Sequence, residues 1–208
     1  MKLSTLKGLA GATAMAVVLA AASQASATTV DFATGGDGTT AGGSVAGGPL
    51  TYTLSAAATG FLNGGGASVT QSSNGLGVNG SPDLQPYQID SIPGSEVLTV
   101  TFSWAVKLLD ISLGLLNGWD DFEIATNNTG YTHYGPNLVN PISIGENYVT
   151  WFSIRASGDG ERWRLGNDAF TLASASVAAV PVPAAGFLLM GALGGLAALR
   201  RRKTLTAA

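Results

Sequence analysis

The sequence predicts an all-β protein built from antiparallel strands, and three observations support this prediction. Apolar residues in the middle of the 208-residue chain recur at every second position rather than every 3.6 residues. Short apolar runs alternate with turn-forming pieces, and 29 of the residues are glycine. Between the two ends no long amphipathic helix is expected. Two packed antiparallel sheets, or a barrel, would satisfy this pattern.

The period-two runs locate the expected strands. Alternation is clearest at residues 50–54, 98–104 and 109–115, where large apolar side chains occupy every other position. Further short runs lie at residues 67–71, 122–125, 148–155 and 169–174. The asparagines and glycine of residues 127–130 tolerate the positive φ of tight turns, which predicts a hairpin there, and we expect a second turn at residues 145–147.

Composition divides the chain into four segments. These are a signal peptide, a glycine-rich N-terminal segment, a β ectodomain and a C-terminal sorting segment, at residues 1–27, 28–48, 49–176 and 177–208. The second segment has few residues that could build a core, because residues 33–48 contain seven glycines and a single charge. Such a composition favours loop over core.

The N-terminus has the three parts of a secretory signal peptide. Lys2 and Lys7 provide the positive start, and residues 8–22 form an uncharged, largely apolar run. Small residues, Ala25 and Ala27, close the segment and fit the shallow pockets of signal peptidase. We therefore expect a signal helix that is cleaved after Ala27, with the remainder of the chain exported.

The C-terminal segment is long enough to span a membrane. No charged residue occurs from residue 177 to residue 199. As a helix, residues 184–199 would measure about 24 Å and residues 177–199 about 34 Å, against a hydrocarbon core of about 30 Å. A basic cluster follows at Arg200, Arg201, Arg202 and Lys203. The positive-inside rule keeps this cluster in the cytoplasm as a stop-transfer signal.

A short motif precedes this helix, consisting of Val180, Pro181, Val182, Pro183 and Ala184. Motif, apolar helix and basic cluster in this order resemble the PEP-CTERM sorting signals of exported proteins in Gram-negative bacteria, most closely the VPLPA-CTERM variant. Val182 stands where that variant has leucine. The resemblance implies recognition by an exosortase, a transpeptidase of the inner membrane, and transfer to the cell surface or to an exopolysaccharide matrix.

The residues of the motif agree with this resemblance on physical grounds. Each proline fixes φ, lacks an N–H and disfavours helix in the residue before it, so residues 180–183 should be extended and accessible to an enzyme. Comparable sorting tails are often carried by sandwich ectodomains, and the resemblance therefore favours a jelly-roll-like β-sandwich. An alternative is that the prolines only end the helix of an ordinary, unprocessed membrane anchor.

Charge and composition exclude several classes of function. All 13 acidic residues lie between Asp31 and Asp168, where only four basic residues accompany them. An acidic surface repels phosphate backbones, so nucleic-acid binding is not expected. The chain has no cysteine and one histidine, His133, which excludes disulfides, thiolate zinc sites and multi-histidine metal sites. We expect His133 on a strand surface and predict no catalytic residue.

Two sets of side chains remain as candidate binding sites. Asp120 and Asp121 lie at the start of an expected strand and could bind calcium through carboxylate oxygens, although a solvated acidic turn fits the same residues. No other cofactor is expected. Trp119 and Trp163 have polar neighbours and are candidates for stacking against sugar rings. The other two tryptophans, Trp104 and Trp151, continue strand patterns and are expected inside.

These features predict a non-enzymatic, exported surface or matrix protein with a structural, adhesive or glycan-associated role. Its expected partners are signal peptidase, the exosortase, the inner membrane and an exopolysaccharide. One alternative is an exported glycoside-active enzyme, because hydrolysis of a sugar linkage needs two carboxylates about 5 to 10 Å apart and the chain has many. The other is a simple anchored envelope protein.

Overall fold

The alternating pattern of the sequence is realised as an all-β fold. A computed structural model describes residues 26–180 apart from residues 35–36, 46–47, 60–65, 82, 84, 92–93, 136 and 158–167. Twelve strands are present in the described residues: β1 (Ala27–Asp31), β2 (Gly38–Thr39), β3 (Gly42–Ser44), β4 (Thr51–Thr59), β5 (Ser68–Ser72), β6 (Gly75–Asn79), β7 (Ile89–Asp90), β8 (Ser95–Gly114), β9 (Phe122–Thr126), β10 (Thr132–Tyr134), β11 (Ile142–Ala156) and β12 (Ala169–Ala179). No helix in this part of the chain is long and apolar enough to cross a membrane.

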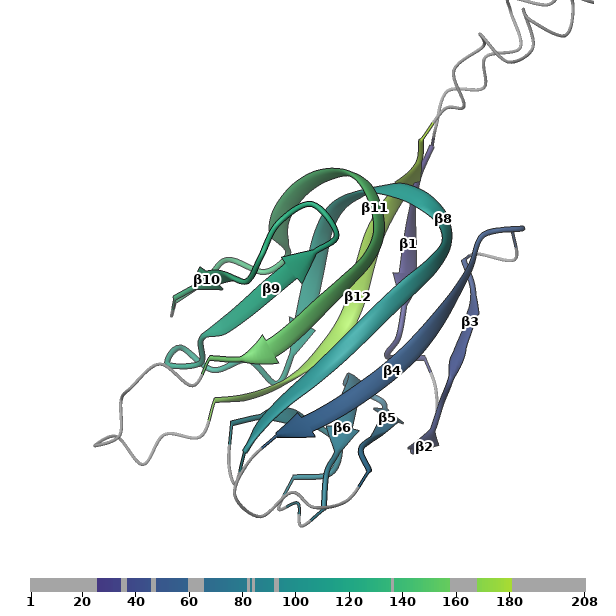
Figure 1. Cartoon of the computed structure of the whole chain (residues 1–208). Helices are drawn as coiled ribbons and strands as arrows, with labels where there is room; N and C mark the ends of the chain where they lie inside the picture. Colours follow the sequence, from purple (N-terminus) through teal and green to yellow (C-terminus); the bar gives the residue numbers. More distant parts are fainter. Residues whose placement is uncertain are drawn as a thin grey trace, which may run out of the picture. The chain divides into compact units, whose positions relative to one another are not determined.

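All paired strands are antiparallel, as the sequence predicts. The order along the sheet is β10-β9-β11-β8-β12-β6-β5-β2. Four strands lie off this path, with β1 and β7 paired to β12, β4 paired to β8, and β3 paired to β4. Figure 1 shows β10, β9, β11, β8 and β4 side by side, with β12 and β1 behind them.

The two longest strands, β8 and β11, bend and take part in both halves of the sheet (Figure 1). The first half of β8 pairs with β4 and with the last residues of β11, whereas its second half pairs with β12 and with the first residues of β11. Register shifts between Val149 and Trp151, and nearer the start of β11, accompany the bend. Such irregularities let a strand turn sharply without losing its partner.

A single apolar cluster fills the interior. Along β11, Phe152 and Ile154 are buried, and Leu98 and Val100 opposite them on β8 are buried too. The ring of Phe122 in β9 packs edge-on against Phe170 in β12, with 5.8 Å between centroids, although these strands are not paired. The inward faces of the two halves of the sheet therefore pack together.

The two ends of the described unit lie side by side. The N-terminal strand β1 pairs with the C-terminal strand β12, and Ala27 is the partner of Ala178. Strand β12 continues to Ala179, three residues beyond the expected boundary at residue 176, and β1 begins at the expected cleavage site. The expected signal helix and the expected transmembrane helix fall on residues 1–25 and 181–208, outside the described residues.

The structure differs from the sequence-based expectation at one turn, at Trp104 and in the glycine-rich segment. The turn expected at residues 145–147 is an irregularity inside β11, where Gly145 adopts a φ of 70°. Trp104 is 42% exposed rather than inside. The glycine-rich segment contains β1 and two short strands and contributes Phe32, before its first glycine, and Val45, between its glycines, to the core.

Candidate functional site

A cluster of polar side chains lies on strands β9, β10 and β11, on the face turned away from the core. In β9, Phe122 and Ile124 point inward, so Glu123 between them points outward. Antiparallel register places Glu123 beside Arg155 of β11 and beside His133 of β10. The predicted hairpin at residues 127–130 is confirmed, since it joins β9 to β10 and so brings His133 to Glu123.

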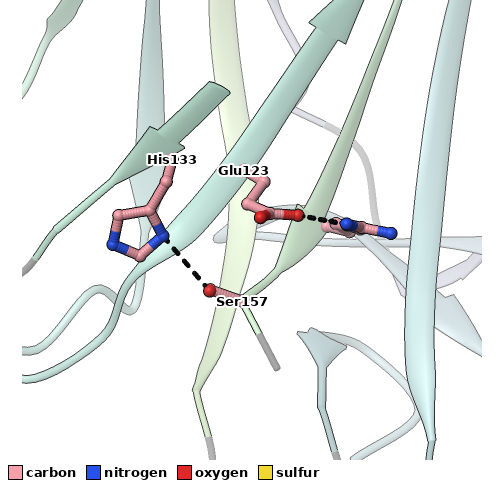
Figure 2. Close-up of polar contacts among 4 residues, drawn as sticks. Glu123, His133 and Ser157 are labelled. Atoms are coloured by element: carbon pink, nitrogen blue, oxygen red, sulfur yellow. Dashed lines mark hydrogen bonds and ion pairs between the residues drawn. The ribbon is translucent and has the colours of Figure 1, made fainter. Parts of the chain in front are cut away.

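Arg155 is held between an acid and an aromatic ring. Its guanidinium forms an ion pair and a hydrogen bond with the carboxylate of Glu123, drawn in Figure 2. Its Cζ atom also lies 3.9 Å from the centre of the Tyr131 ring, a cation–π contact. The Glu123 side chain is largely buried and Arg155 is about one-third exposed. Partial burial and two partners fix the planar guanidinium in one orientation.

His133 joins this cluster to the end of β11 (Figure 2). Its Nδ1 atom is 3.2 Å from Ser157 Oγ, and its Nε2 atom is 3.9 Å from a carboxylate oxygen of Asp121. The backbone N–H of Ser157 donates to the carbonyl of Asp121, which fixes the serine next to the start of β9. The histidine side chain is 42% exposed, as expected for a strand-surface residue.

The residue types of a Ser-His-Asp triad therefore come together without the geometry that nucleophilic catalysis needs. Ser157 is only 3% exposed, so its hydroxyl is closed to a substrate. The 3.9 Å between Asp121 and the imidazole exceeds hydrogen-bond length, and the carboxylate would have to orient the ring at closer range. The hydrogen bonds of Ser157 with His133 and with Asp121 attach the end of β11 to β10 and to the start of β9.

Asp168, just before β12, lies against the same cluster. Burial, a side-chain hydrogen bond with Asp121 and the nearby charge of Asp121 together raise the pKa of Asp168 to about 7. The hydrogen bond and the negative charge beside it both favour the protonated form of Asp168. Glycosidases hold their two carboxyl groups about 5 Å or more apart, farther than two carboxyl groups joined by a hydrogen bond.

Asp120 has a structural role in the described residues. It is 2% exposed, and its carboxylate accepts hydrogen bonds from the backbone N–H and side-chain amide of Asn117 and from the N–H of Ala169. Burial raises the pKa of Asp120 above its ordinary value, while these donors act in the opposite direction. Its oxygens thus tie the loop before β9 to the start of β12.

Calcium binding at Asp120 and Asp121 stays a prediction. The oxygens of Asp120 already accept the hydrogen bonds described above, and Asp121 faces Asp168 and His133 instead. In residues 26–180, leaving aside the gaps given above, no group of three or more His, Asp or Glu side chains could hold a metal ion.

A second acidic group lies at the start of β8. Glu96 is 2% exposed, and its two carboxylate oxygens accept hydrogen bonds from the N–H groups of Gly80 and Asp90. Burial, together with the charges of Asp90 and Asp83, raises the pKa of Glu96 to about 8. Sequence reasoning did not single out Glu96, because it occupies an ordinary inward position of a period-two strand.

The exposure of the tryptophan side chains differs in part from the expectation. Trp119 is 75% exposed, which confirms its expected place on the surface, whereas Trp163 lies outside the described residues. Trp104 and Trp151 were both expected inside, but Trp104 is 42% exposed and Trp151 is half-buried on the outward face of β11. Two exposed tyrosines, Tyr131 and Tyr148, lie on the loop and strand beside them.

The sorting residues lie almost entirely beyond the described part of the chain. Val180 directly follows β12 and is its last described residue. The other residues of the motif and the whole basic cluster lie outside the described part of the chain; they are Pro181, Val182, Pro183, Ala184, Arg200, Arg201, Arg202 and Lys203. Comparison of the chain with protein-family models, with curated proteins and with solved structures finds no match.

Proposed function

We propose that the chain is an exported protein of the cell surface or extracellular matrix, sorted through its C-terminal PEP-CTERM-like signal. The order of motif, apolar segment and basic cluster in residues 180–203 carries this proposal. The pairing of β1 with β12 is consistent with it, because it brings the expected cleavage site at Ala27 beside Ala178, two residues before Val180, the first residue of the motif.

The domain itself has a structural, adhesive or glycan-associated role in this proposal, and we assign it no enzymatic activity. The buried Ser157 and the contact between Asp121 and Asp168 support that assignment. The fold we propose is an antiparallel β-sandwich of the jelly-roll type, in which β8 and β11 contribute to both layers. The packing of β9 against β12 across the core supports two layers.

Substitutions in the motif test sorting directly. In the native host, the double variant Pro181→Ala/Pro183→Ala should accumulate in the inner membrane with its C-terminal segment intact, because residues 180–183 lose their enforced extended conformation. The matched control is Val182→Leu, which restores the leucine of the VPLPA variant and should leave sorting intact. If the double variant reaches the surface as efficiently as the wild-type chain, the motif is not a sorting signal and the protein is a simple anchored envelope protein.

A further inference from the structure

The outward side of strands β10, β9, β11, β8 and β4 forms a single face whose composition is unusual. Register places Ala125, Ser153, Thr99 and Ser55 side by side across four of these strands. The next row contains Trp151, Thr101 and Thr53. Small and hydroxylated side chains thus make up most of these two rows, and Ser55, Thr53 and Thr101 among them are exposed to solvent.

Aromatic side chains lie at both sides of this hydroxyl-rich area. Tyr131, 41% exposed, precedes β10 next to the outward position of Ala125. Trp151 lies half-buried on β11, two residues from Ser153 on the same side of the strand. Ala125 and Ser153 lie between the two rings in the register, and both are buried although they face outward.

The irregular pairing of β8 with β11 adds two more rings. Thr101 pairs with Trp151 and Val106 with Val149, so residues 102–105 of β8 face a single residue of β11. Extra residues in one strand redirect side chains outward. Trp104 lies in this stretch and is 42% exposed, and Tyr148 lies at the same point of β11 and is 61% exposed. We call Tyr131 and Trp151, with the hydroxyl-bearing rows beside them, the aromatic face, and we infer that the exposed rings of Trp104 and Tyr148 extend it.

The aromatic face also carries an ordered set of hydrogen-bonding groups. Arg155 is fixed by Glu123 and by the Tyr131 ring, so its guanidinium presents donors in a set plane beside an acceptor carboxylate. Thr99 and Ser153 share a hydrogen bond of 2.7 Å across the strands, which orders both hydroxyls. Planar apolar rings next to fixed donors and acceptors suit a ligand with flat C–H faces and hydroxyl edges.

The charge of the residues around the aromatic face favours a neutral ligand over an anionic one. Arg155 is neutralised by Glu123, and the surrounding sequence from residue 31 to residue 168 has 13 acidic residues against four basic ones. An anionic chain would be repelled by this excess. From β10 to β8 the face crosses three strand spacings, about 14 Å, which exceeds one sugar ring. We propose that the aromatic face binds a neutral polysaccharide chain.

This proposal deepens the proposed function, since it names the class of glycan and the surface that contacts it. It places the contact on β11, β8 and the loop before β10, whereas the sequence pointed to Trp119 and Trp163. Trp151 and Tyr131 would stack on sugar rings, and Arg155 with Glu123 would hydrogen-bond hydroxyl pairs. Trp119, although more exposed, lies in the loop before β9 and would not contribute.

Affinity electrophoresis of the full-length chain tests this, in a non-ionic detergent without a sugar headgroup. Gels would contain xylan, laminarin, dextran or hydroxyethyl cellulose as neutral probes and alginate as an anionic one. We expect at least one neutral probe to retard the chain. Trp151→Ala and Tyr148→Ala should each weaken that retardation about tenfold, in line with the energies of aromatic stacking. Trp119→Ala is the matched control and should migrate as the wild-type chain does.

Tyr148→Ala keeps the test decisive, because Tyr148 is largely exposed and its removal leaves the core unchanged. The proposal is overturned if no neutral probe retards the chain, if only alginate does, or if Trp119→Ala weakens binding while Tyr148→Ala does not. Sorting is measured separately by the motif variants, so a correctly sorted chain that ignores every neutral probe would refute this inference alone.

Discussion

The buried carboxyl group of Glu96 makes the stability of the domain depend on pH in an unusual direction. Most carboxylates in folded proteins stabilise the fold when ionised, but burial and the charges of Asp90 and Asp83 raise the pKa of Glu96 from 4.5 to about 8. The folded state therefore holds a proton that the unfolded state releases. Stability is highest below the unfolded pKa and is lost as the pH rises toward and through about 8.

The size of the effect follows from the two pKa values. One pKa unit corresponds to about 1.4 kcal/mol, so the full penalty above pH 8 is about 4 to 5 kcal/mol. Between pH 5 and pH 7 the free energy of unfolding should fall by about 2 to 3 kcal/mol from this residue. The Glu96→Gln variant should lose this dependence. It carries a pH-independent cost of about 1 to 3 kcal/mol, because an amide oxygen cannot accept from both Gly80 and Asp90.

Urea unfolding at pH 5, 6, 7 and 8 measures the effect, on residues 28–180, which contain the whole described core. The difference in slope between the wild-type domain and Glu96→Gln isolates this residue from other titrating groups. Asp37→Asn, at an exposed aspartate, is the matched control and should retain the wild-type slope. Equal slopes for the wild-type domain and Glu96→Gln would show that Glu96 does not take up a proton on folding in this pH range.

Three further substitutions test the packing and the acidic cluster. The pKa of Asp168 is raised to about 7, so its ionisation destabilises the folded domain increasingly as the pH rises from about 4 to about 7. Asp168→Asn should remove this destabilisation. The prediction is contradicted if the melting temperature of the variant falls between pH 5 and pH 8 by as much as that of the wild-type domain. Phe122→Ala removes a fully buried ring and should lower the free energy of unfolding by about 3 to 5 kcal/mol in urea, and a loss below 1 kcal/mol would be incompatible with a ring packed across the core. Gly77→Ala would place a Cβ against the carbonyl carbon of Tyr87 and should lower the free energy of unfolding in urea by about 1 to 3 kcal/mol. Gly38→Ala is the control, because its Cβ would meet open space and should lower the free energy of unfolding far less. Equal losses for the two variants would show that the backbone at Gly77 does not lie tightly against Tyr87.

The strands could be predicted because their local pattern and their environment agree. Leu98, Val100 and Phe102 alternate in sequence and are all buried in β8. The pattern fails two residues later at Trp104, because β8 departs from regular pairing where it bends beside β11. Period-two reasoning assumes an unbroken pleat, and a bulge that depends on the partner strand leaves no signal in the alternation itself.

The turn expected at residues 145–147 shows a related limit. The glycine signal is real, since Gly145 adopts a positive φ. A hairpin would require the chain to reverse there, but β8 offers partners on both sides, with Ser143 opposite Asp110 and Glu146 opposite Leu108. Tertiary pairing therefore turns a local turn signal into an irregularity within one strand.

The candidate site could be predicted only in part. Exposure of Trp119 follows from its polar neighbours, and the hairpin that carries His133 follows from its asparagines and glycine. The contacts of His133 with Ser157, and of Asp121 with Asp168, join residues 24 and 47 positions apart. Their proximity depends on how β9, β11 and β12 meet, which one sequence does not encode locally.

Export and sorting of the chain, as we propose them, can be read from the intact mass and the cellular fraction of the mature protein in its native host. We expect a mature chain that begins at Thr28, lacks residues 200–208 and lies outside the inner membrane. A chain that still carries Arg200 to Lys203 and remains in the inner membrane would contradict it.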